Sequence, residues 1–199
     1  MDETKEATEQ LPDLPDLPEL RITGIYGEVT EEKCFEVISS MLHLKDIGTD
    51  QHKKGSEIVL TYEPFEFIVS TEGGGASDMF AVYDMMRLIR EDCDIETLGI
   101  GKVMSAGVLL LAAGTKGKRR IGKNCRVMIH PVKAGHAGYV HEMQNELVEV
   151  KWIQARYTEC LVSETNMTIQ DIKKILNKKV NVYISAEEAV QLGIADKIV

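Results

Sequence analysis

The chain is poor in the residues that build metal sites. Its four cysteines are far apart and form no CxxC pair; they are Cys34, Cys93, Cys125 and Cys160. This spacing excludes the common zinc-binding patterns. We therefore expect reduced and mostly buried thiols, with no metal and no cofactor.

The sequence also lacks long apolar runs. The longest, from Ala106 to Ala113, is far shorter than the roughly 20 residues that cross a bilayer. The opening MDETKEATEQ has neither the basic nor the apolar region of a secretory signal. We expect a soluble cytoplasmic protein with no membrane partner. The plastid stroma and the cytoplasm of a phage-infected cell are alternative compartments.

Positive charge is scarce. The formal net charge is −9, whereas binding to nucleic acid phosphates requires a cationic face, so we expect no nucleic acid partner. The compact basic run from Lys116 to Arg120 is interrupted by glycine and predicts a solvated turn.

Residues 1–19 predict an acidic extension separate from one globular domain over residues 20–199. The repeat LPDLPDLPEL has prolines at 12, 15 and 18, which fix φ and remove N–H donors, so the segment should be extended. It is either a disordered leader or a docking segment whose leucines grip a partner.

From Leu20 onward, strand-like and helix-like patterns alternate, which predicts an α/β domain with parallel pairing favoured. The expected strands are 20–27, 57–62, 65–70, 95–101, 126–130 and 182–184. Expected helices begin at Thr30, Ser77, Tyr139, Thr168 and Ser185, and residues 46–56 predict a polar loop.

The helix expected over 139–163 carries apolar residues at spacings of three and four, which indicate an amphipathic helix. The positions are Val140, Met143, Leu147, Val150, Gln154, Tyr157 and Leu161, all apolar except Gln154.

Three local features carry possible chemistry. Ser105 stands where a strand and glycine turn lead into an apolar helix, so it is either a helix cap or a nucleophile beside free N–H groups. The loop TEGGG, with Gly74 at its centre, is either a tight turn or a donor of an N–H to an oxyanion. His130 ends an apolar strand before Pro131, where it can face a cleft as a general base.

Together these features match the parts that acyl transfer requires: a serine, a histidine and backbone donors. The glycine pattern completes neither a P-loop nor G-x-G-x-x-G, so a phosphate site is not expected.

In three segments the sequence resembles the Clp protease proteolytic subunit family. These are TEGGGASDMFAVYDMMRLI, GKVMSAGVLLLAAGTKGKRRIGKNCRVMIHP and YISAEEAVQLGIADKIV. The resemblance implies a crotonase-like α/β spiral of β-β-α units with a protruding strand–helix handle at about 131–163. It also implies stacked heptameric rings, homo- or hetero-oligomeric, which receive unfolded protein substrates from a Clp-type ATPase unfoldase.

By the same resemblance Ser105 is the nucleophile of a serine endopeptidase, His130 its base, and the N–H groups of Gly74 and Ala106 the oxyanion hole. The family's aspartate is missing from KKILNKKVNVYIS. Counting back from Ser185 favours Asn177 as the third member. Counting forward from Thr168 gives Ile175, and Asn181 is a further candidate.

Two other functions remain open. The missing acid favours a catalytically weak or silent ring subunit, and the implied fold is shared with crotonase-type acyl-CoA enzymes. A pure interaction module would explain only the proline–leucine repeat.

Overall fold

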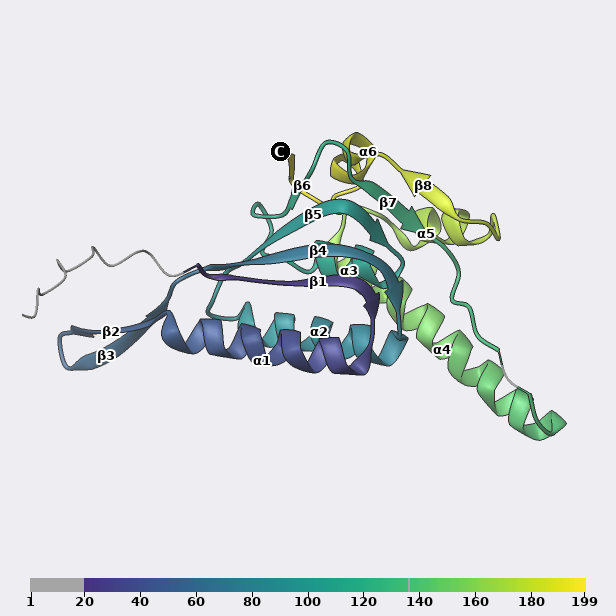
Figure 1. Ribbon diagram of the computed structural model, residues 1–199, viewed down its shortest axis with the longest axis horizontal. Helices are drawn as coiled ribbons and strands as arrows, with labels where there is room; N and C mark the ends of the chain where they lie inside the picture. The colour runs from purple at the N-terminus through teal and green to yellow at the C-terminus, as the bar shows by residue number, and fades with distance from the viewer. Residues whose placement is uncertain (1–19, 136) are drawn as a thin grey trace, which may run out of the picture.

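The computed structural model describes residues 20–135 and 137–199 as a mixed α/β fold (Figure 1). The main sheet has the order β1-β4-β5-β6-β9, with β7 paired to both β5 and β8. All its pairings are parallel except β7 with β8, so the fold class expected from the sequence is confirmed. Its strands are β1 (Ile22–Val29), β4 (Phe65–Gly74), β5 (Ile95–Met104), β6 (Arg120–Ile121), β7 (Arg126–Ile129), β8 (Val182–Ile184) and β9 (Lys197–Ile198).

Strands β4 and β5 form the centre of the core. Along each strand buried residues alternate with partly exposed ones, and Phe65, Phe67 and Val69 are buried on one face. Helices α1 (Glu31–Ile47), α2 (Ala76–Ile89) and α3 (Ala106–Ala112) cover that face. Because α3 lies inside the domain, every one of its residues is buried and apolar.

Residues 46–56 were predicted as a loop, and this is wrong. Helix α1 extends to Ile47, and β2 (Thr49–Lys54) pairs antiparallel with β3 (Glu57–Tyr62) in a separate two-stranded sheet. The sequence TDQHKK is polar throughout, so it lacks the alternation by which a strand is recognised. The hairpin projects from the main sheet (Figure 1).

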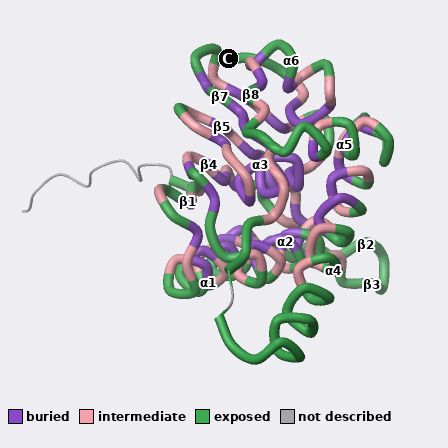
Figure 2. Tube along the Cα trace, turned by 90° about the vertical axis from the view of Figure 1, so that its right-hand side faces the viewer, coloured by how far each residue is buried: buried purple, intermediate pink, exposed green. Residues whose placement is uncertain are grey.

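Helix α4 (Val140–Glu164) is the helix predicted over 139–163, but only part of its apolar face is buried. Tyr157 and Leu161 are buried in the core, whereas Val140, Met143 and Leu147 are exposed. Figure 2 shows the outer turns of α4 as exposed. Helical spacing reveals an apolar face without revealing what covers it, and the exposed outer half fits the protruding handle that the family resemblance implies.

No strand occurs among the described residues between β7 and α4. In the described part of the chain, no helix is both long and apolar enough to cross a membrane.

The C-terminal part contains α5 (Ile169–Leu176) and α6 (Ala186–Gln191). The capping box predicted at Ser185 is confirmed, because the Ser185 hydroxyl accepts from the Glu188 N–H and the Glu188 carboxylate accepts from the Ser185 N–H. A second capping box joins Thr168 to Asp171 at the start of α5.

The basic run 116–120 is only partly a solvated turn. Arg119 is buried, donating to both oxygens of Asp196 and to the backbone carbonyls of Ala112 and Glu164. The Glu164 carboxylate in turn pairs with Arg90 at 2.8 Å. Arg119 therefore ties α3, the end of α4 and the C-terminal segment together, and charged residues in a glycine-rich turn gave no indication of this.

Asp196 allows a test of this network. Burial by itself would raise the pKa of its carboxyl, but hydrogen bonds and charge from Arg119, with the Gly117 N–H, outweigh burial and hold the pKa below its usual value. Such a carboxyl stabilises the fold above its unfolded-state pKa of about 4, and the contribution is lost as pH falls through the folded pKa. We predict that Asp196→Asn lowers the free energy of unfolding by about 3 kcal/mol at neutral pH, and by less near pH ~2, in urea titrations.

The control is Asp92→Asn, which removes an exposed ion pair with Lys45. Exposed pairs contribute less than about 1 kcal/mol, so this variant should unfold almost like the parent protein. Equal losses in the two variants would contradict a structural role for the Arg119 network.

Candidate active site

Ser105 lies at the junction between β5 and α3. Its backbone has φ 54° and ψ −116°, a conformation that few residues other than glycine adopt. Its N–H donates to the Met128 carbonyl at 2.8 Å, and its carbonyl accepts from the Tyr157 hydroxyl at 2.9 Å. Ser105 is the N-terminal boundary residue of α3, yet its side chain forms no cap hydrogen bond. The hydroxyl is therefore not used as a helix cap, which was one of the two interpretations of the sequence.

The glycine loop packs directly against this serine. Gly73 has φ +98°, and a β-carbon placed there would lie 2.6 Å from Cβ and 3.0 Å from Oγ of Ser105. Next to it, a β-carbon at Gly74 would overlap the Val29 carbonyl oxygen. The first two glycines of the loop are thus required by close approach, and the loop is more than a tight turn.

Ala106 is the first residue of α3, and its N–H has no backbone acceptor among the described residues. Free N–H groups at the first turn of a helix are suited to a developing negative charge. Gly74 is exposed at the end of β4 and lines the same cavity as Ser105.

His130 follows β7 and is partly exposed. Its Nδ1 lies 2.6 Å from the Pro131 carbonyl oxygen. Because a carbonyl can only accept, this contact fits the neutral tautomer with the proton on Nδ1 and the lone pair on Nε2, which is the form a general base needs. The Gln154 side-chain oxygen accepts from the Val132 N–H at 2.8 Å and holds the neighbouring peptide in place.

One cavity of about 410 Å³ brings four predicted residues together: Gly74, Ser105, Ala106 and His130 all line it. Apolar side chains of Met79, Met128 and Ile153 form other parts of its wall. No hydrogen bond links Ser105 to His130 within the described residues.

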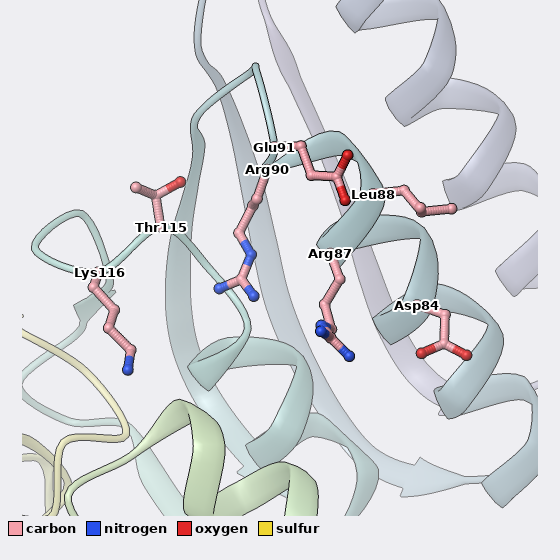
Figure 3. Close-up of a pocket in the computed structure, with 7 residues that line it drawn as sticks. All are labelled: Asp84, Arg87, Leu88, Arg90, Glu91, Thr115 and Lys116. Carbon is pink, nitrogen blue, oxygen red and sulfur yellow. The ribbon is translucent and has the colours of Figure 1, made fainter.

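A different cavity, of about 590 Å³, lies between α2 and the loop after α3 (Figure 3). Arg90 points into this cavity, but its guanidinium group already donates hydrogen bonds to the Gly114 carbonyl and to the Glu164 carboxylate. None of the residues that line it is a serine, cysteine or histidine, so it offers no nucleophile and base for acyl transfer. Nor do the described residues gather three or more metal-binding side chains at any point.

A protein-family model described as Clp protease matches residues 9–199. The chain belongs to the Clp protease family. The resemblance found in the sequence is therefore confirmed, and the match begins within residues 1–19, which lie outside the described residues. Members of this Clp protease family form oligomeric rings and act on protein substrates.

The candidates for the third catalytic member of this Clp protease chain lie in different surroundings, at the end of α5 and just before β8. Asn177 ends α5 and lines another cavity, of about 550 Å³, with Pro131 and Gln154. Ile175 packs partly buried against the core. Among the described residues, neither side chain forms a hydrogen bond with His130.

Asn181 has a closer relation to His130. In the antiparallel pair of β7 and β8, Val127 is opposite Ile184 and Ile129 is opposite Val182. Continuing this register by one residue aligns His130 with Asn181, and directly opposed residues in such a ladder have side chains on one face. Counting along the chain from Ser185 did not identify this alignment, because it depends on which strands pair.

The Gly73 contact can be tested with a matched pair of glycine substitutions. We predict that Gly73→Ala slows fluorophosphonate labelling of Ser105 at least about tenfold, because the added methyl group displaces the serine; a shift of about 1 Å is enough for a loss of this order.

Gly117→Ala is the control, since Gly117 also has positive φ but faces open space. Gly117→Ala should lose about 1 kcal/mol of stability through backbone strain, and Gly73→Ala should lose more, because the overlap with Ser105 adds to that strain. If both label as fast as the parent protein in mass-spectrometric time courses, the proposed contact does not constrain Ser105.

Proposed function

We propose that this chain is a serine endopeptidase subunit of a Clp-type compartmental protease, which cleaves unfolded polypeptides to short peptides. The observation that carries the proposal is the convergence of Ser105, His130, Gly74 and Ala106 on one cavity. These residues come from the ends of β4, β5 and β7 and from the start of α3.

In the proposed reaction, His130 Nε2 takes the hydroxyl proton while Ser105 Oγ attacks the substrate carbonyl. The N–H groups of Ala106 and Gly74 stabilise the resulting oxyanion, and His130 then gives its proton to the leaving amine. Water, activated by the same imidazole, releases the acyl group. The Nδ1 contact with Pro131 supports this direction of proton transfer.

We propose Asn181 as the residue that orients His130, with Asn177 as the alternative; the asparagine side-chain oxygen would replace the Pro131 carbonyl as the acceptor from Nδ1. An asparagine orients the imidazole without adding negative charge. In trypsin-like enzymes the change from aspartate to asparagine lowers kcat about 10⁴-fold, although papain-like proteases use asparagine naturally. We therefore propose that the peptidase has a lower kcat than a site with an aspartate.

A second candidate is a catalytically silent ring subunit. It is favoured by the missing acid and by the lack of a Ser105–His130 hydrogen bond within the described residues. Nothing in the site specifically favours a crotonase-type acyl-CoA enzyme. For either ring subunit we propose stacked heptameric rings and a Clp-type ATPase as the partner that supplies unfolded substrate.

The peptidase proposal makes a direct prediction for the nucleophile. Ser105→Ala should abolish fluorophosphonate labelling and lower peptide kcat at least about 10³-fold, as measured with a fluorogenic peptide on the assembled protein. Ser56→Ala, at an exposed serine in the β2–β3 turn, is the control and should behave like the parent. Failure of the parent protein to label would support the silent subunit, and hydrolysis that survives Ser105→Ala would exclude Ser105 as the nucleophile.

The two asparagines can be separated by introducing the missing charge at each. Asn181→Asp is expected to raise kcat by about 10- to 1000-fold, because a carboxylate stabilises the imidazolium that forms during attack. Asn177→Asp adds the same charge at the end of α5 and should leave kcat within about twofold. Rates for both variants are measured from low to neutral pH, and the reverse ranking would identify Asn177 as the partner of His130.

A further inference from the structure

One face of the β2–β3 hairpin presents two exposed apolar side chains next to two polar ones. Lys53 is opposite Ile58 and Gln51 is opposite Leu60, so these four side chains share one face of the two-stranded sheet. Ile58 is 66% exposed and Leu60 is 45% exposed. We call these four residues the hairpin face. A lone hairpin is only marginally stable in water, so covering this face would stabilise it.

The described part of the chain begins beside the base of this hairpin. Arg21 donates from Nε to the Pro64 carbonyl at 3.1 Å, and from its terminal nitrogen to the carbonyls of Glu63 and Leu44 at 2.8 and 2.7 Å. These carbonyls belong to the end of α1 and to the link between β3 and β4. Arg21 thus fixes the start of β1 beside the hairpin (Figure 1).

The sequence of residues 11–20 complements the hairpin face. Its prolines favour polyproline II, which repeats every three residues. Leucines at 11, 14, 17 and 20 would then share one edge, and acids at 13, 16 and 19 another. On the hairpin face, Ile58 and Leu60 could contact the leucine edge, and the cationic Lys53 could pair with the acidic edge.

The length of the segment is also sufficient. Nine residues of polyproline II extend about 28 Å, and a strand of six residues extends about 20 Å. Prolines have no N–H to add to a strand edge, so this segment fits the face of the hairpin better than its edge.

We propose that residues 11–19 dock across the hairpin face of their own chain, with the leucine edge on Ile58 and Leu60 and the acidic edge toward Lys53. This inference does not depend on peptidase activity and holds for a silent subunit as well.

Two measurements on the full chain test the docking. In hydrogen–deuterium exchange, Leu14→Ser with Leu17→Ser should speed exchange of the amides of 49–62 at least threefold. These substitutions lie outside the hairpin, so they affect it only through docking. In zero-length carbodiimide coupling, Lys53 should join to an acid at 13, 16 or 19.

The control for coupling compares the two faces of the hairpin. Ile58→Ser with Leu60→Ser should reduce the Lys53 cross-link at least fivefold, whereas Val59→Ser with Thr61→Ser, on the opposite face, should preserve most of it. Unchanged exchange in the leucine variant, or equal cross-linking in both hairpin variants, would overturn the proposal. Cross-links mainly between isotope-labelled and unlabelled chains would assign the segment to a neighbouring copy and overturn docking within one chain.

Discussion

The arrangement of the candidate site depends on the contact between Gly73 and Ser105. The end of β4 approaches the end of β5 so closely that position 73 has no room for a β-carbon. Ser105 in turn has an unfavourable backbone conformation, held by Met128 on its N–H and Tyr157 on its carbonyl. Strain of this kind persists only where surrounding contacts hold it, and here they come from β7 and α4.

The parallel pairing of the strands explains why segments far apart in the sequence meet at this contact. Parallel strands place their carboxyl ends at one edge of a sheet, and the residues after β4, β5 and β7 meet there. His130 reaches the cavity because β7 pairs with the last residues of β5, directly before Ser105. The pairing of β5 with β7 thus brings the serine and the histidine to the same cavity, which no local sequence motif indicates.

The sequence was sufficient to predict the alternation of strands and helices and the four residues that share the cavity. It was insufficient where the answer depends on a partner in space. The strand at 49–54 is polar and becomes a strand only by pairing with 57–62. The sequence suggests that Arg119 is an exposed charge, whereas in the fold it is buried and paired with Asp196. The alignment of Asn181 with His130 likewise requires the register of β7 and β8.

Helix α4 is buried in the core at its C-terminal end and exposed at its N-terminal end. Tyr157, near its inner end, donates to the carbonyl of Ser105, while the turns from Val140 to Val148 are exposed. A partner that grips the outer turns and shifts the helix would therefore act on the serine. By thermodynamic reciprocity, a ligand whose binding beside Ser105 depends on that shift would change the affinity for the partner by the same factor.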